Sequence, residues 1–295
     1  MASETVGHAP SAGQYIQHHL HHLQSNFSFE AASQKSIVDF SLFNVDSLIW
    51  SVVCGALGCW LLWLGARRAT SGVPGRFQAA VEILAEMVEN QAKGVIHNAK
   101  SRKLVSPLAL TVFVWIFMMN AMDMLPVDWI PAMWHSAGPA MGYKDYMRVV
   151  PTADLSTTLG LSVSVLLVCL FYNVKIKGVG GWAHELVAAP FGDKLFLYPI
   201  NFVMQIIEFI AKTVSHGMRL FGNMFAGELV FMLVALMGGA WAWQFNPVSG
   251  GFWLAVGHVI AGSAWAIFHI LVITLQAFIF MMLTLIYVGQ AHDSH

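Results

Sequence analysis

Five long, predominantly apolar stretches dominate this chain of 295 residues. About 20 consecutive apolar residues are enough for a helix to cross the ~30 Å hydrocarbon core of a membrane. Only 11% of the residues are charged, and a soluble fold could not bury so much apolar surface. We therefore predict an all-α membrane protein with about five transmembrane helices, near residues 47–66, 104–125, 155–174, 199–240 and 251–288.

The last two stretches are much longer than one membrane crossing needs. Pro199 and Pro247 bracket the fourth stretch, and the fifth runs from Gly251 to Val288 without a proline. At about 1.5 Å per residue each helix would exceed ~50 Å, so it must tilt steeply or bend. We expect these two stretches to form a hairpin of long, steeply tilted helices.

The basic residues predict the orientation of the chain. Seven Lys and Arg lie between residues 67 and 103 and three between 175 and 194, whereas one precedes residue 47. Loops rich in Lys and Arg stay in the cytoplasm, which predicts an outer N-terminus and a cytoplasmic C-terminus. The expected organisation is an external tail, residues 1–46, followed by a single integral membrane domain, residues 47–295. We expect no cleaved signal.

The first cytoplasmic loop contains a helical pattern of its own, with apolar residues on one face and acidic residues on the other. The apolar positions are Phe77, Ala80, Val81, Leu84, Ala85 and Val88, and the acidic positions are Glu82, Glu86 and Glu89. This pattern predicts an amphipathic helix on the cytoplasmic side. It would serve either as a docking surface for another subunit or the membrane interface, or as a structural connector.

Composition argues against several other classes of function. The formal net charge is −1, with no basic or acidic block, so we expect no nucleic-acid partner. The three cysteines lie in apolar stretches, which argues against a disulfide framework or a zinc ribbon. The tail carries the histidines His18, His19, His21 and His22. A metal could bind such a cluster, but we interpret it as a histidine-rich polar tail and expect no metal site and no cofactor.

The fourth apolar stretch contains ionisable side chains, which are costly at membrane depth and are therefore functional by default. These residues are Glu208, Lys212, Arg219 and Glu228. At 100° per residue, a polar stripe forms along one side of the predicted helix. The stripe comprises Glu208, Lys212, Arg219 and Asn223, with Ser215 and His216 beside it. Glu228 lies nine residues beyond Arg219 and points to the opposite side.

The fifth stretch carries His258, His269 and Gln276 on one face, from which they could meet Glu228 across a hairpin. No Asp, Glu, Lys or Arg occurs between residues 229 and 292, so His269 and Gln276 are the main candidates for carrying protons there. Imidazole titrates near pH ~6.5, which suits a relay. Arginine stays protonated, so Arg219 would act as a fixed charge. The structural alternative is a Glu208–Lys212 ion pair with His269 as a helix-packing residue.

Two blocks of the last two apolar stretches read Met218-Arg-Leu-Phe-Gly-Asn-Met-Phe-Ala-Gly-Glu-Leu229 and Ala266-Ile-Phe-His-Ile-Leu-Val-Ile-Thr-Leu-Gln-Ala-Phe-Ile-Phe280. These blocks resemble subunit a of bacterial F-type ATP synthases. Upstream segments, among them Met119-Asn-Ala-Met-Asp-Met-Leu-Pro-Val-Asp128, extend the resemblance over most of the chain beyond Asp46. It implies a non-catalytic, proton-conducting stator subunit in the bacterial inner membrane. The implied partners are a rotating ring of c subunits, the b-subunit peripheral stalk and the rest of the complex.

The resemblance also implies roles for particular residues. Arg219 matches the stator arginine that faces the ring carboxylate and blocks a proton leak. The outer half-channel, called here the uptake path, is implied to contain Glu228, His269, Asn223, Gln276 and Asp123. Protons would neutralise a ring carboxylate, travel with the ring and leave through an inner half-channel, so that proton flow drives rotation and ATP synthesis elsewhere in the complex. The coupling ion, H⁺ or Na⁺, stays open because the ring carboxylate belongs to another chain.

The inner half-channel, called here the release path, departs from the family pattern. This chain has Gln205 and Thr213 where relatives commonly have an acid and a proline, and His216 replaces a usual apolar residue. We expect the release path to contain Glu208, Lys212, Ser215 and His216.

Two other classes of function compete with this interpretation. A secondary transporter would show inverted repeats and broken helices in matching positions, and we find neither in the sequence. A haem-binding membrane anchor would use His258 or His269 as an axial ligand and would need a second inward histidine at matching depth. An absorption spectrum would test the haem alternative.

Overall fold

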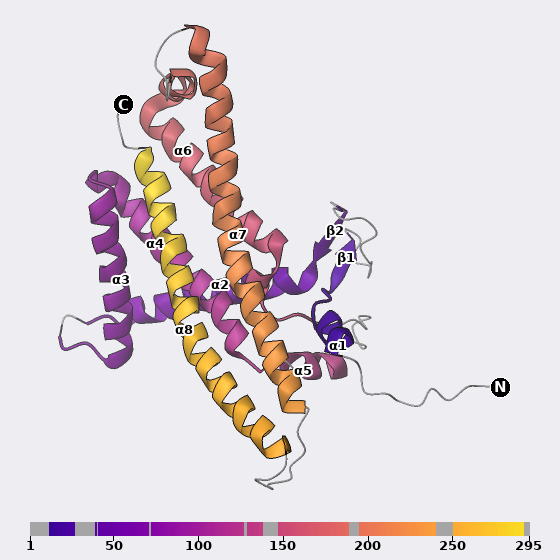
Figure 1. Ribbon diagram of the computed structural model, residues 1–295. Coiled ribbons are helices and arrows are strands. Elements are labelled where there is room, and N and C mark those ends of the chain that lie inside the picture. The colour runs from indigo at the N-terminus through magenta and orange to yellow at the C-terminus, as the bar shows by residue number, and fades with distance from the viewer. Residues whose placement is uncertain are drawn as a thin grey trace.

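The computed structural model describes residues 12–26, 39, 41–70, 72–126, 129–137, 147–188, 195–239 and 250–291. Much of the expected tail 1–46 lies outside the described residues, as does residue 240 of the fourth predicted span. In chain order the elements are α1 (Ala12–His19), β1 (Gln24–Asn26), β2 (Leu42–Asn44), α2 (Val45–Arg67), α3 (Arg76–Val95), α4 (Ala99–Ala121), η1 (Met122–Met124), α5 (Trp129–Ala137), η3 (Pro151–Ala153), α6 (Leu155–Ala188), η4 (Leu195–Leu197), α7 (Tyr198–Gly239) and α8 (Gly250–Gln290) (Figure 1).

Five helices of the described residues are long and apolar enough to cross a membrane, which confirms the expected fold class. They are α2, α4 with η1, α6, α7 and α8. The third differs from its predicted span because α6 continues to Ala188 across a kink at Gly178, whose φ of 73° favours glycine. The Asn98 side chain caps the start of α4 by accepting a hydrogen bond from the Lys100 amide at 2.9 Å.

The last two helices are the longest described elements, with 42 residues in α7 and 41 in α8. At about 1.5 Å per residue each is roughly 60 Å long, against about 35 Å for the 23 residues of α2. Figure 1 shows α7 and α8 running side by side while α2 crosses behind them. If α2 spans the bilayer directly, α7 and α8 must be steeply tilted, as expected from their length.

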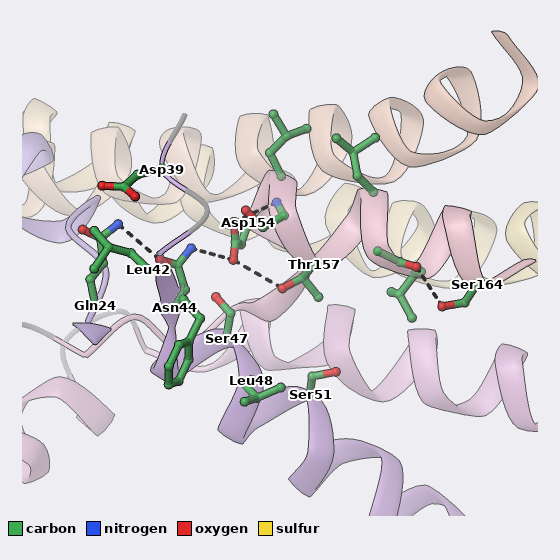
Figure 2. A pocket seen from close by; sticks show the side chains of 16 residues that line it. Gln24, Asp39, Leu42, Asn44, Ser47, Leu48, Ser51, Asp154, Thr157 and Ser164 are labelled. Carbon is green, nitrogen blue, oxygen red and sulfur yellow. Dashed lines mark hydrogen bonds between the residues drawn. The ribbon is translucent and has the colours of Figure 1, made fainter. Parts of the chain in front are cut away.

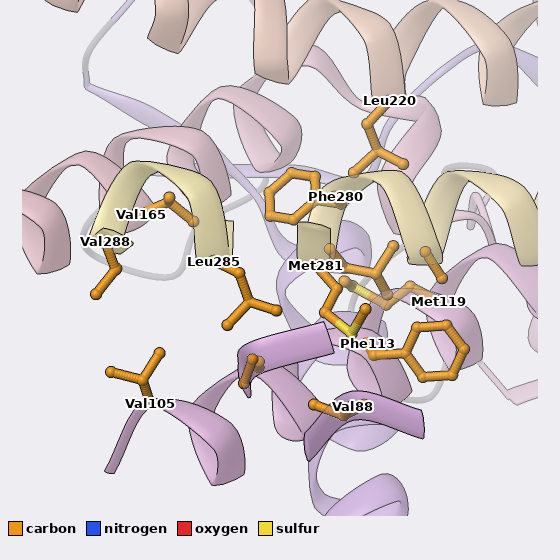
Figure 3. Packing of buried hydrophobic residues seen from close by; sticks show 14 of the residues in the cluster. Val88, Val105, Phe113, Met119, Val165, Leu220, Phe280, Met281, Leu285 and Val288 are labelled. Atoms are coloured by element: carbon orange, nitrogen blue, oxygen red, sulfur yellow. The ribbon is translucent and has the colours of Figure 1, made fainter. Parts of the chain in front are cut away.

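The apolar core lies where α3, α4, α6, α7 and α8 meet. Figure 3 shows Val88 of α3 and Val105 of α4 on the side opposite Leu285 and Val288 of α8. The pairs α4–α8 and α6–α7 pack most extensively. Small buried residues, Ala92, Ala109 and Ala277, allow the helices to approach closely. This packing fixes α7 and α8 against the shorter helices.

The expected amphipathic helix between the first and second apolar stretches is α3. Val88 and Ala92 are buried, and α3 packs against α4, α2 and α8. Phe77 and Ala80 differ from the expectation because both are exposed, while Gln78 between them is buried. The Gln78 side chain donates to the Thr70 carbonyl and to Glu82, which explains how a polar residue occupies that position.

The described part of the N-terminal tail folds back onto the start of α2. Strands β1 and β2 form a short antiparallel ribbon in which Ser25 pairs with Phe43. The Leu23 amide donates to Asp46 Oδ2 at 3.0 Å, and the Val45 amide donates to the Leu23 carbonyl at 2.9 Å. These bonds hold the segment after α1 against the helical domain.

Candidate functional site

A buried ion pair joins Glu228 of α7 to Arg148, which lies in the described residues 147–150 directly before η3. The Arg148 Nε donates to Glu228 Oε1 at 3.1 Å, and its Nη2 donates to Glu228 Oε2, so the contact is bidentate. Both side chains are buried. A buried charge is tolerated only when it is paired and hydrogen-bonded, which this fork geometry achieves. Glu228 faces the interior of the protein, whereas Arg219 is on the exposed side of α7, in agreement with the helical spacing of the two residues.

Sequence reasoning missed Arg148 as a site residue. Arg148 contributes to the sequence argument only as a basic residue between two predicted spans, because hydrophobic periodicity does not predict the position of a side chain in a non-helical segment. A signal was present, since Arg148 stands in the short apolar run Met147-Arg-Val-Val-Pro151. A cation in such a run between two spans is a candidate for a buried ion pair.

A second acid–base pair lies next to the first. Asp123 Oδ2 is 2.6 Å from His269 Nε2, and both side chains are buried. Asp123 reaches this position because α4 ends at Ala121 and the chain continues as the 3₁₀ turn η1. Trp265, one turn earlier on α8, stacks on the imidazole, and Phe231 of α7 meets it edge-on. The ring is therefore held in place on both sides.

Glycines on α7 make room for two histidines of α8. A Cβ at Gly227 would collide with the His269 ring and would lie 3.2 Å from the Asp123 carboxylate. A Cβ at Gly238 would likewise collide with the His258 ring. We call the gap that each glycine leaves for a histidine ring a notch. The glycines are 11 residues apart (238 − 227), and the histidines are also 11 residues apart (269 − 258), so the two notches lie in the same register along the helix pair.

The two acid–base pairs share a small cavity. Asp123, Arg148 and Glu228 line it, together with Met122, Leu125, Pro126, Val149 and Val150. Its volume of about 20 Å³ is enough for roughly one water molecule. The Glu228 and Asp123 carboxylates therefore border one small cavity that otherwise has a mainly apolar lining.

Arg219 lies on a different surface from this buried cluster. It is exposed, as are Ser215 and Asn223, on a face of α7 that the described residues leave uncovered. Exposed apolar residues of α7 stand near them in the chain, among them Ile210, Val214 and Met218, and Ile267 and Leu271 of α8 are also exposed. No ion pair to Arg219 is found within the ranges described above. Gln276 is buried two turns beyond His269 on α8.

The residues expected in the release path separate into two groups. Glu208 Oε1 and Lys212 Nζ form an ion pair at 2.6 Å with a half-exposed carboxylate, and Lys212 also donates to Gln290 Oε1 at 3.1 Å. His216 instead turns inward, where its ring lies 3.8 Å from that of Phe280. Its Nε2 has no hydrogen-bond partner in the described part of the chain. The burial of Lys212 is intermediate between that of the exposed Glu208 and that of the buried His216.

A larger pocket opens between β2, α2 and the start of α6 (Figure 2). The Asn44 side chain donates to Asp154 Oδ2 at 2.9 Å, and Asp154 Oδ1 accepts from the Ser156 amide at 3.0 Å, which caps α6. None of the predicted site residues lines this pocket. Across the described ranges, no three His, Cys, Asp or Glu side chains are grouped so as to hold a metal ion.

Five apolar helices around buried acid–base pairs define a multi-pass membrane protein with ionisable groups placed at membrane depth. The family model described as ATP synthase A chain matches residues 48–289. The chain is 66% identical to ATP synthase subunit a of Paracidovorax citrulli, with all of both chains covered, and 44% identical to that of Tolumonas auensis, with 99% of each covered. The chain therefore belongs to the ATP synthase A chain family.

Membership confirms the resemblance seen in the sequence. The chain is a non-catalytic, proton-conducting stator subunit of a bacterial F-type ATP synthase and a multi-pass membrane protein. A subunit a from an Acidovorax species is 65% identical over 98% of both chains.

Proposed function

We propose that protons reach the rotor through the cluster of Asp123, Arg148, Glu228 and His269. The observation that carries this proposal is the pair of buried acid–base contacts bordering one small cavity. Carboxylates and imidazole exchange protons readily, and burial between helices separates them from lipid. Arg148 cannot release its proton usefully, so it acts here as a counter-charge for Glu228. Gln276 and Asn223 would extend the uptake path from this cluster.

The exposed face of α7 and α8 is the proposed contact with the ring of c subunits. Its apolar side chains suit a lipid-facing or helix-facing surface, and Arg219 is a fixed positive charge within it. An ionised ring carboxylate would be attracted to Arg219, whereas a protonated one would move away into lipid. The absence of an internal partner for Arg219 in the described residues leaves it available for this contact.

The proposed orientation places the N-terminus outside and the C-terminus in the cytoplasm of the bacterial inner membrane. It keeps residues 1–46 as an external tail, part of which packs on residues 47–295, the single membrane domain. The basic residues before and within α3 then face the cytoplasm, where a contact with the b-subunit stalk is proposed. Each proton would gain about 2.3 kcal/mol per 100 mV of membrane potential.

Replacing His269 by alanine tests the uptake path. We expect ATP-driven proton pumping by the complete enzyme to fall about a hundredfold, because the proton-exchanging partner of Asp123 is lost. His258→Ala is the matched control, since His258 occupies the equivalent notch at Gly238 but has no carboxylate partner among the described residues. Pumping should be quantified in inverted membrane vesicles by quenching of a pH-sensitive dye. Equal losses in the two variants would contradict the proposal.

The release path is proposed to pass Glu208, Lys212, Ser215 and His216. We expect Glu208→Gln and His216→Leu each to lower pumping while leaving the amount of assembled enzyme unchanged. The Glu208–Lys212 pair is half exposed, so its loss costs little stability. His216→Leu replaces an unpartnered buried imidazole by an apolar side chain. Wild-type pumping rates in both variants would exclude these two residues from the path.

A further inference from the structure

His22 of the N-terminal tail contacts the same arginine that holds Glu228. It lies between α1 and β1, and its Nε2 is 2.9 Å from Arg148 Nη1. Its Nδ1 is 3.5 Å from Asp46 Oδ2, at the start of α2. The adjacent Leu23 amide and the Arg148 amide also donate to Asp46 Oδ2, at 3.0 and 3.3 Å. Asp46 therefore ties the tail and the Arg148 segment together.

The contact with Arg148 fixes the protonation state of His22. A guanidinium group offers only donors, so His22 Nε2 must accept and cannot carry a proton while the bond exists. The neutral ring then has its proton on Nδ1, which lies 3.5 Å from Asp46 Oδ2 and makes no hydrogen bond within the described residues. Protonation of Nε2 would abolish the bond to Arg148 and would set two positive groups against each other. The hydrogen bond between His22 and Arg148 therefore forms only when His22 is neutral.

The four side chains of this cluster differ in how much of their surface is exposed to solvent. The side chain of His22 is 17% exposed, against 8% for Glu228, 5% for Arg148 and 0% for Asp46. Water therefore reaches the imidazole more easily than it reaches the ion pair behind it. A proton that comes from the side of the tail meets His22 before Glu228.

We propose that His22 is the outermost proton-exchanging residue of the uptake path and also positions Arg148 on Glu228. A hydronium ion on the tail side gives its proton to Nε2 and becomes water, and the Arg148 bond to His22 breaks. The proton then passes from Nε2 to the Glu228 carboxylate, and His22 returns to its neutral form bound to Arg148. One proton is taken up and one is passed on. This inference rests on the proposed uptake path.

The surrounding charges are compatible with such an exchange. Asp46 of α2 lies 3.5 Å from Nδ1, and Arg148 lies 2.9 Å from Nε2. Glu228 of α7 lies behind Arg148, within electrostatic range of His22. Along its own segment the neighbouring imidazoles are His19, which is buried at the end of α1, and His21, which is exposed.

The test compares His22→Gln, His22→Leu and the control His21→Gln in the complete ATP synthase, reconstituted into liposomes. ATP synthesis is measured while the pH on the tail side is varied between about 5.5 and 7.5 at constant driving force, the range in which imidazoles exchange protons. Glutamine keeps an acceptor for Arg148 but cannot titrate. We expect His22→Gln to lower the rate about tenfold and to flatten its pH dependence, and His21→Gln to match the wild type.

The outcomes separate this inference from the proposed function. A wild-type pH profile in His22→Gln overturns the role of His22, even where His269→Ala abolishes pumping. If His269→Ala retains wild-type pumping, the uptake path itself is wrong. A failure of His22→Leu to assemble leaves the decision to His22→Gln, which preserves the hydrogen bond to Arg148.

Discussion

Replacing Arg219 by alanine is expected to abolish ATP-driven proton pumping and to raise the passive proton permeability of the membrane. Arg219 lies on the exposed face of α7 without an internal ion pair in the described residues, so the fold should not depend on it. At about 4 Å and an effective dielectric constant near 20, its attraction for a ring carboxylate is roughly 4 kcal/mol. Losing that term corresponds to about a thousandfold in rate.

Arg67→Ala is the control for Arg219→Ala, because it removes an exposed arginine that stacks on Trp63 and lies outside both proposed paths. We expect pumping near the wild type in this variant. Both proton pumping and leak should be measured in vesicles with equal amounts of assembled enzyme. Pumping and ATP synthesis that survive Arg219→Ala would refute the role of Arg219 as the barrier charge.

Replacing Arg148 by alanine is expected to destabilise the subunit, in contrast to Arg219→Ala. Removing one partner of a buried ion pair leaves the other charge buried without a counter-charge, which typically lowers the stability of the fold by about 3–5 kcal/mol. Here the stranded group is the Glu228 carboxylate, which loses both bonds of the fork. We expect little subunit a in assembled enzyme, measured by immunoblotting of the purified complex, and no pumping.

A double variant separates stability from transport at this pair. In Arg148→Ala/Glu228→Gln the stranded charge is gone, so assembly should recover substantially while pumping stays absent. Arg67→Ala, which removes an exposed arginine stacked on Trp63, should leave both quantities near the wild type. Normal assembly of the single variant Arg148→Ala would show that the pair contributes nothing to the fold.

The fold follows closely from the sequence because a bilayer leaves few solutions. A long apolar stretch must be a helix when no water can satisfy its backbone, which is why α7 and α8 were predicted nearly to the residue. The same periodicity predicted that Glu228 and Arg219 lie on opposite sides of α7. It was less informative for His216, which stands beside the polar stripe in sequence but turns toward Phe280.

The buried cluster was only partly predictable. His269 stands out as an imidazole in a stretch without other charge, but its pairing with Asp123 spans two helices and depends on a 3₁₀ turn. Arg148 belongs to a segment without helical periodicity and Asp46 to the first turn of α2, and they come together with His22 only through the fold. Contacts between residues about 80 to 126 positions apart leave no local pattern in a single sequence.

The matched notches of α7 and α8 have a mechanical consequence. A helix pair that borders a turning rotor experiences a sideways force, and smooth apolar surfaces would let one helix slide along the other. His258 and His269 fit where Gly238 and Gly227 lack side chains. A slip of one turn, about 5.4 Å, would press both rings against occupied positions. The two histidine–glycine contacts therefore keep α7 and α8 in a fixed register along their axes while torque is applied.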